Sequence, residues 1–378
     1  MSRSDVSFDQ VRKIVVKIGS ALLTERGTGL VLSRIAAIAA QLTHALAQDY
    51  QAVLVSSGAV AEGCNRLGWS SRPDTVHELQ AAAAVGQIGL AEAWEGALKK
   101  HGTGAAMIML THEDLADRQR YLNARATIQQ LLQLGVVPII NENDTVATEE
   151  IRFGDNDTLA ALVANLIEAD LLVILTDVEG LLDKDPSLHA DAKVIHHGLA
   201  SDSSLGNFAG EPGVLGRGGM VTKLSAARLA ARSGAHTVIA SGQNDEVLAE
   251  ILKGAEVGTL LQAEVSPMTA RKRWIAGHLR AKGSLTVDAG AAKVLVKDGV
   301  SLLAVGVVAV DGAFERGDVV RIRTDDGREI AQGLTNYASS DVQRLIGKRT
   351  EEFVDHIDFV GEPELVHRDN LVVLVSEG

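Results

Sequence analysis

The stretch Val136-Val-Pro-Ile-Ile-Asn-Glu-Asn-Asp144, with Gly154-Asp-Asn-Asp157 shortly after it, contains the densest group of polar side chains in the sequence. Its first five residues are apolar, and this pattern predicts a buried strand that ends where the polar residues begin. The second group stands just before a helix predicted over residues 158–167. In open α/β sheets, small polar ligands bind at the carboxyl ends of the strands. We therefore expect a ligand site where this strand ends and this helix begins.

The chain up to about residue 240 repeats the same order of strand, short polar turn and helix. Six predicted strands with five predicted helices between them favour a largely parallel sheet with helices on both faces, which is an α/β fold. The composition agrees, because 46% of the residues are apolar and only 3% are aromatic, as expected of helices that pack closely on a parallel sheet. The predicted strands are 13–18, 52–56, 105–110, 136–140, 171–175 and 237–240, and the predicted helices are 32–46, 79–100, 122–134, 158–167 and 223–233.

A second, smaller domain is expected towards the C-terminus, because 378 residues exceed what one hydrophobic core usually serves. The composition changes near residues 261–284, so we predict a first domain over 1–262, a linker over 263–280 and a second domain over 281–378. The second domain contains short apolar runs separated by glycine turns, and Asp326-Gly327 predicts a hairpin. Its predicted elements are strands 285–287, 302–310, 319–324, 329–334 and 371–375 and one short helix near 340–346.

Charge and cysteine usage exclude several classes of protein. The net charge of −13 repels phosphate backbones and disfavours broad nucleic-acid binding. The single cysteine, Cys64, rules out a disulfide within the chain and fits a reducing cytoplasm. The first ten residues are mostly polar and contain no apolar signal-peptide core, and no apolar run reaches the roughly 18 residues of a membrane span. We therefore expect a soluble cytoplasmic protein with no membrane partner.

Lysines, glycines and carboxylates gather at the predicted strand ends. No Walker A pattern occurs, no G-x-G-x-x-G follows the first strand, and metal-ligating cysteines and histidines do not cluster. Lysines at strand ends offset charge on phosphoryl oxygens, glycines let backbone N–H groups reach phosphates, and a carboxylate holds lysines or Mg²⁺. These residue types predict phosphoryl transfer. The segments concerned are Lys17-Ile-Gly-Ser20, Ser56-Ser-Gly-Ala59, Thr176-Asp177, Gly218-Gly-Met-Val-Thr-Lys223 and the two groups quoted first, in 136–144 and 154–157.

These motifs together resemble the amino acid kinase superfamily and, within it, the glutamate 5-kinase family that carries a C-terminal PUA domain. The resemblance covers nearly the whole chain and includes Leu122-Asn-Ala-Arg125 in addition to the segments above. It implies an amino acid kinase fold followed by a small, mostly β PUA-like domain. It also implies ATP-dependent phosphorylation of the side-chain carboxylate of L-glutamate to glutamyl 5-phosphate, the first step of proline biosynthesis.

The resemblance assigns roles to individual residues. Lys17 and Lys223 would contact the ATP phosphates, and Asp157 would orient both lysines. The implied glutamate-binding residues are Ser57, Asn141, Asp144 and Asn156, and the implied nucleotide-binding residues are Lys17, Thr176, Asp177, Arg217, Gly218, Gly219, Met220, Val221, Thr222 and Lys223. Arg217 stands where the family often has a small hydroxyl residue, which leaves its own contact open.

Cofactors and partners follow from the same resemblance. It implies ATP as co-substrate with Mg²⁺, a homo-oligomer (a dimer or a tetramer), and proline as a feedback inhibitor. Residues 145–153 are the expected lid and the expected seat of that regulation.

Two other readings remain open from the residues alone. One is another kinase of the superfamily, such as an acetylglutamate kinase or an aspartokinase, which would use a different acceptor. The other is an RNA-binding protein that acts through the PUA domain. From residue 275 onward the chain has twelve Lys/Arg against seventeen Asp/Glu, and this acidic excess disfavours contact with RNA phosphates.

Overall fold

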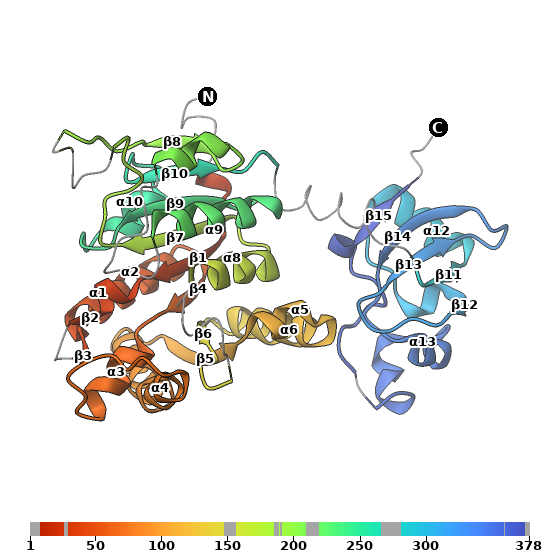
Figure 1. Ribbon diagram of the computed structural model, residues 1–378. Coiled ribbons are helices and arrows are strands. Elements are labelled where there is room, and N and C mark those ends of the chain that lie inside the picture. Colours follow the sequence, from red (N-terminus) through yellow and green to blue (C-terminus); the bar gives the residue numbers. More distant parts are fainter. Residues whose placement is uncertain are drawn as a thin grey trace. The chain divides into compact units, whose positions relative to one another are not determined.

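The computed structural model describes residues 8–25, 29–146, 156–184, 189, 191–208, 219–265, 281–358 and 360–374. The chain forms two compact units, Met1–Pro267 and Met268–Gly378 (Figure 1). The division falls inside the stretch 263–280 that the sequence predicts as a linker. Among the described helices, none is both long and apolar enough to cross a membrane.

The first unit is built on an eight-stranded sheet with the strand order β5-β6-β4-β1-β7-β9-β10-β8 (Figure 1). The predicted largely parallel α/β sheet is confirmed, since all pairings from β5 to β9 are parallel. Two strands that the sequence did not predict, β8 and β10, extend one edge, and β10 runs antiparallel to β9. The strands are β1 Lys13–Ile18, β4 Gln51–Ser56, β5 Gly104–Leu110, β6 Val136–Glu142, β7 Leu171–Thr176, β8 His197–Leu199, β9 His236–Ser241 and β10 Thr259–Gln262.

Helices cover both faces of this sheet, and the central strand β1 shows how the faces are divided. Ile14, Val16 and Ile18 belong to the core beneath α2 (Leu32–Leu46) and α4 (Val76–Lys99). Val15 belongs to the opposite core, beneath α6 (Arg118–Gln133), α8 (Asn156–Ile167) and α9 (Met220–Arg232). Side chains alternate along a strand, so Lys17 lies on the same face as Val15. The alternation therefore directs the lysine towards α8 and α9.

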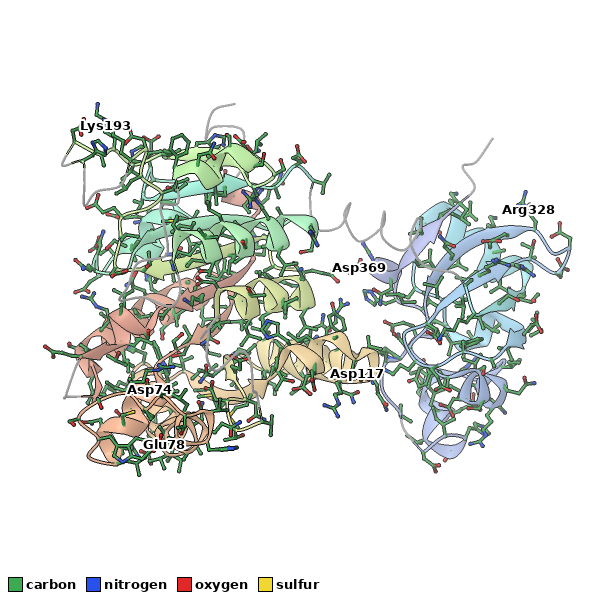
Figure 2. The ribbon with its side chains drawn as sticks, in the orientation of Figure 1. Asp74, Glu78, Asp117, Lys193, Arg328 and Asp369 are labelled. Atoms are coloured by element: carbon green, nitrogen blue, oxygen red, sulfur yellow. The ribbon has the colours of Figure 1, made fainter. Side chains whose placement is uncertain are left out.

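Two helices begin earlier than the apolar pattern predicted, because their caps precede that pattern. Thr75 caps α4 by accepting a hydrogen bond from the backbone of Glu78. Asp117 caps α6 by accepting from the backbone of Arg120 at 2.9 Å. Figure 2 labels Glu78 and Asp117. Short elements complete the described part of this unit: α1 Ser20–Leu23, α3 Ala59–Arg66, α5 His112–Ala116, α10 Val247–Leu252 and the hairpin of β2 Thr24–Glu25 with β3 Gly29–Leu30.

The second unit is a five-stranded sheet with the order β12-β11-β13-β14-β15. The predicted hairpin at Asp326-Gly327 is confirmed, because β13 and β14 are antiparallel and Gly327 has φ of +84°, which favours glycine. Arg328, labelled in Figure 2, follows that turn. The strands are β11 Gly283–Val287, β12 Val307–Gly312, β13 Val319–Arg323, β14 Glu329–Leu334 and β15 Leu371–Val373.

The prediction of one short helix in this unit was wrong, because a second helix, α12 (Ala289–Asp298), joins the expected α13 (Ser339–Leu345). Asp288 caps α12, accepting from Ala291 N at 2.7 Å. Only Leu295 of α12 is fully buried, so the sequence carries little of the apolar spacing that identifies a helix. The predicted strand 302–310 is also shorter, since a 3-10 turn at Ala304–Gly306 precedes β12.

Candidate active site

Two lysines and one aspartate form a buried charged centre at the carboxyl edge of the sheet. Lys17 comes from the end of β1, Asp157 from the first turn of α8 and Lys223 from the first turn of α9. Lys17 Nζ lies 2.6 Å from Asp157 Oδ1, and Lys223 Nζ lies 3.2 Å from Asp157 Oδ2. All three are at most 6% exposed. The structure thus brings together the three residues that the resemblance assigned to catalysis, and we call them the lysine–aspartate centre.

The electrostatics of this centre favour an anion. Burial by itself raises the pKa of Asp157, but the charges of Lys17 and Lys223 outweigh it and hold that pKa below its ordinary value. Thr222 also donates to Asp157 Oδ2 at 2.8 Å. With one carboxylate between two ammonium groups, the centre carries one net positive charge in a weakly hydrated place. Such a charge interacts strongly with a polyanionic ligand.

Backbone donors lie beside the lysines. Helix α9 begins at Met220 with Gly219 as its N-cap residue, and the first N–H groups of a helix have no partner within it. Val221 is exposed and Met220 is half-buried, so this end is open to a ligand. Arg217 and Gly218 lie outside the described residues. The α9 terminus can therefore add backbone hydrogen bonds to the charge that Lys223 supplies.

The other predicted nucleotide residues lie at the end of β7, the strand next to β1 in the sheet. Thr176 is buried and donates from Oγ1 to Asp177 Oδ1 at 3.0 Å, while Asp177 itself is exposed. Nearby, the backbone of Gly19 donates to Leu175 O at 3.1 Å. The ends of β1 and β7 are thus joined directly, and this is the sheet edge at which α/β folds bind ligands.

A cluster of neutral polar groups occupies the neighbouring part of the edge, at the ends of β4 and β6. The two hydrogens of Asn156 Nδ2 are shared among three acceptors, Ser57 Oγ at 2.9 Å, Asn141 Oδ1 at 3.0 Å and Ser56 O at 3.2 Å. Asn141 and Asn156 are buried. The chain then turns from β4 into α3 at Gly58, whose φ of +113° favours glycine. The structure therefore brings Ser57, Asn141 and Asn156 into one network, as the resemblance led us to expect.

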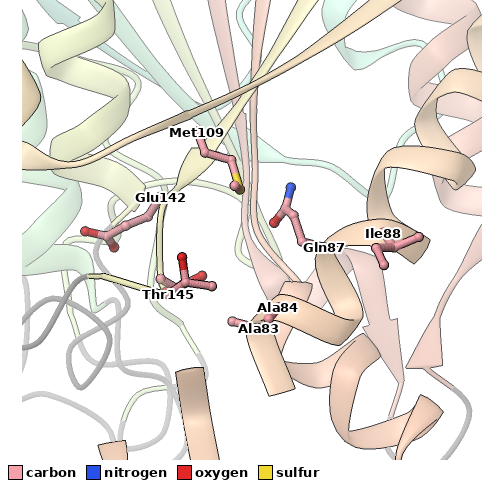
Figure 3. A pocket seen from close by; sticks show the side chains of 8 residues that line it. Ala83, Ala84, Gln87, Ile88, Met109, Glu142 and Thr145 are labelled. Carbon is pink, nitrogen blue, oxygen red and sulfur yellow. The ribbon is translucent and has the colours of Figure 1, made fainter. Parts of the chain in front are cut away.

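Asp144, the fourth predicted glutamate-binding residue, lines a cavity beside this network. The cavity has a volume of about 300 Å³. Figure 3 shows Ala83, Ala84, Gln87 and Ile88 on one wall, from α4, with Glu142 and Thr145 opposite. Burial, and to a smaller degree the neighbouring Glu142 carboxylate, raise the pKa of Asp144 to about 7, although Arg72 opposes the shift. Near neutral pH this carboxyl group therefore exists in both charge states.

Sequence reasoning missed several residues of this region. Gln87 accepts a hydrogen bond from Asn141 Nδ2 at 2.8 Å, and Trp94 Nε1 donates to Ser56 Oγ at 2.9 Å. Both come from α4, where a glutamine in an alanine-rich helix gives no signal of its own. Glu142 was part of the quoted motif but received no role, and it is 3% exposed. In the expected lid, residues 147–153 lie outside the described residues.

Comparison with known protein families identifies both units. A model of the amino acid kinase family matches residues 12–241, and a model of the PUA domain matches residues 283–357. The chain therefore belongs to the amino acid kinase family. A solved structure of a UMP kinase from Bacillus anthracis covers 68% of this chain and 98% of its own, with 16% identity and a TM-score of 0.47.

Full-length relatives narrow the family further. A glutamate 5-kinase of Thioalkalivibrio sulfidiphilus is 55% identical over 375 residues, which is 99% of this chain and 100% of that protein. A glutamate 5-kinase of Pseudomonas savastanoi pv. phaseolicola is 56% identical over 361 residues, 95% of this chain and 98% of that protein. Within the amino acid kinases, the chain belongs to the glutamate 5-kinase family.

Proposed function

We propose that this protein transfers the γ-phosphoryl group of ATP to the side-chain carboxylate of L-glutamate, giving glutamyl 5-phosphate for proline biosynthesis. The observation that carries the proposal is the position of two consecutive residues at the start of α8. Asp157 pairs with Lys17 and Lys223, and Asn156 bonds to Ser57 and Asn141. One helix end thus joins a centre suited to phosphates to a cluster suited to an amino acid.

The chemistry needs charge and position more than proton transfer. A carboxylate is ionised at neutral pH, so it attacks the γ-phosphorus without a general base. An oxygen–phosphorus bond forms, the bond to the bridging oxygen breaks, and ADP leaves with that electron pair. Both reactants are anions, and Lys17 and Lys223 offset their repulsion and the charge that develops on the phosphoryl oxygens. Asp157 holds the two ammonium groups in place between turnovers.

The amino acid end of the site would recognise the α-ammonium group of glutamate. Asp144 supplies a carboxylate in the cavity beside the amides. The Nδ2 group of Asn156 already donates to protein oxygens, so its Oδ1 is the part of the amide left to accept from a ligand. These two acceptors, the Asp144 carboxylate and Asn156 Oδ1, suit the positively charged α-ammonium group. N-acetylglutamate has no charge at that nitrogen, so this arrangement disfavours an acetylglutamate kinase.

Magnesium would enter with the nucleotide. Within the described part of the chain, no group of three or more His, Cys, Asp or Glu residues is suited to hold a metal ion. The oxygens of Asp157 are already engaged by Lys17, Lys223 and Thr222. Mg²⁺ binds readily to phosphate oxygens and keeps several waters. We therefore propose the magnesium complex of ATP as the co-substrate, with the ion carried by the phosphates.

Regulation and assembly are proposed on the basis of the family. We propose proline as a feedback inhibitor that competes for the glutamate cavity, whose walls at Ala83, Ala84 and Ile88 are apolar. We also propose a homo-oligomer, a dimer or a tetramer, in the cytoplasm. The acidic second unit would serve architecture or regulation, and the full-length protein should give no tight RNA complex in a mobility-shift assay at low salt.

One experiment tests the central proposal. ADP formation is measured with L-glutamate, N-acetylglutamate and L-aspartate as acceptors, with and without proline. We expect turnover with L-glutamate, and turnover with N-acetylglutamate alone would refute the assignment. Loss of turnover on adding proline at low glutamate, and its recovery at high glutamate, would support the shared cavity.

A further inference from the structure

The side chain of Gln87 ends a chain of hydrogen-bonded amides that reaches the start of α8. Gln87 Oε1 accepts from Asn141 Nδ2 at 2.8 Å, and Asn141 Oδ1 accepts from Asn156 Nδ2 at 3.0 Å. We call these three residues the amide chain. It links α4, β6 and α8, which are far apart in the sequence. Figure 3 shows Gln87 on α4 at the wall of the cavity that Asp144 also lines.

The direction of every bond in the amide chain is fixed by one backbone group. Ser56 O is a carbonyl oxygen and can only accept, so the Asn156 atom 3.2 Å away must be the donor Nδ2. Asn141 must then present Oδ1 to Asn156, which turns its own Nδ2 towards Gln87. Gln87 is left with the acceptor role. The side-chain nitrogen of Gln87, Nε2, lies 3.2 Å from Met107 Sδ, which is a weak acceptor.

Gln87 stands on a helix that is held firmly in place. A methyl group built on Gly86 would lie 1.9 Å from Ala59 O, and one on Gly63 would lie 1.7 Å from Ala82 O. Helices α3 and α4 therefore pack backbone against backbone at two places along α3, the helix that follows Ser57. Trp94, two turns further along α4, donates to Ser56 Oγ at 2.9 Å. Helix α4 thus contacts the amino acid end of the site at two separate points.

We propose that Gln87 is a positioning residue for the amino acid substrate, acting through Asn141 on Asn156. Its acceptor oxygen holds the Asn141 donor in place, and Asn141 in turn holds Asn156 Nδ2 within the protein and leaves Asn156 Oδ1 available to the ligand. Without that acceptor, the Asn141 donor is buried without a partner, so the Asn141 side chain shifts towards another acceptor. That shift weakens the bond that Asn141 Oδ1 accepts from Asn156 and displaces the Asn156 amide. The inference rests on the proposed function only in naming glutamate as the ligand.

The test compares Gln87→Met with wild-type protein. Methionine keeps a similar length and an apolar contact with the cavity but offers no oxygen acceptor. We expect the KM for glutamate to rise about tenfold, the effect of one buried hydrogen bond lost. The KM for ATP and kcat should stay within about threefold of the wild-type values, because the lysine–aspartate centre is unchanged. The matched control is Gln80→Met on the same helix, where the amide oxygen lies 3.3 Å from His77 Nδ1 and no change is expected.

A double-variant cycle separates positioning from general damage. If Gln87 acts only through Asn156, then Gln87→Met should cost less than about twofold in an Asn156→Ala background. An equal cost in both backgrounds, or an equal rise in the KM values for glutamate and ATP, would overturn the proposal. Wild-type turnover with glutamate tests the proposed function alone. If the ADP-formation assay identifies a different amino acid as the phosphoryl acceptor, the double-variant cycle is run with that amino acid. The proposed function and the proposed role of Gln87 can therefore fail separately.

Discussion

The two ends of the proposed active site use opposite kinds of polar group, although neighbouring residues of α8 anchor them. The lysine–aspartate centre consists of full charges, which attract one another over several ångströms whatever their exact orientation. The amide chain is neutral, and each of its bonds exists only if every amide faces the right way. Ion pairing therefore holds the lysine–aspartate centre together. The amide chain is held by hydrogen bonds whose donor-to-acceptor direction is set by one carbonyl oxygen, Ser56 O. Mutations at the two ends should accordingly change different kinetic constants.

The largest effect is expected at the phosphate end. In the proposed mechanism, replacing Lys223 by alanine removes one positioned charge from the transition state and should lower kcat roughly 10²–10⁴-fold. Steady-state ADP formation at saturating glutamate and ATP measures it. Lys253→Ala, at an exposed lysine after α10, is the control and should leave kcat unchanged. A near-normal kcat for Lys223→Ala would mean that this lysine does not serve the transferred phosphoryl group.

Removing the carboxylate of the same centre should cost stability. In Asp157→Ala the two buried ammonium groups of Lys17 and Lys223 face each other without a counter-charge, which should lower the free energy of unfolding by roughly 3–5 kcal/mol. Urea unfolding at pH 7 measures it. The pKa of Asp157 is depressed, so its contribution is present above the unfolded pKa and is lost only as the pH falls through the folded value.

A second variant checks the physical cause of that loss. Adding Lys17→Met to Asp157→Ala removes one of the two stranded charges and should recover part of the stability. If the double variant is less stable than Asp157→Ala, then lost packing and not repulsion explains the effect.

Substitutions at the amino acid end should change the affinity for glutamate. In the proposed site, Asp144→Ala removes the charge-assisted contact that we propose with the α-ammonium group, and it should raise the KM for glutamate roughly 10- to 100-fold, with the KM for ATP unchanged. Initial rates with each substrate varied in turn provide both constants. Asp74→Ala, at the exposed aspartate labelled in Figure 2, is the control. Equal changes in both KM values would contradict the assignment of Asp144 to the amino acid.

The smallest effect is a dependence on pH. The pKa of Asp144 is raised to about 7, so its charged form grows as the pH rises from 6 to 8, and the KM for glutamate should fall about tenfold across that range. Stability should move the opposite way. The folded state binds this proton more tightly than the unfolded state, so rising pH from about 4 to 7 weakens the fold. Asp144→Asn should remove both trends, and an unchanged pH profile in that variant would assign the titration to another group.

Much of this site could be predicted from local sequence, because its charged residues follow strands with strong apolar patterns. Lys17 is the fifth residue of the run Lys-Ile-Val-Val-Lys-Ile, and Lys223 follows glycines at the start of a helix. Parallel strands must end at one edge, so these residues had to gather there. Helix α12 and the strands β8 and β10 escaped prediction, because few of their residues carry the spacing that marks an element.

The sequence by itself determined the six parallel strands of the sheet, the edge on which the site lies and the charged residues at that edge, since alternation along β1 places Lys17 on the same face as Val15. Only the tertiary structure decided how Asp157 divides its two oxygens between the lysines, how far burial raises the pKa of Asp144, and that Gln87 joins the site at all. The physical reason is that these depend on distances between elements. A carbonyl on β4 fixes an amide on α8, and through β6 it fixes one on α4; no spacing along the chain encodes that link.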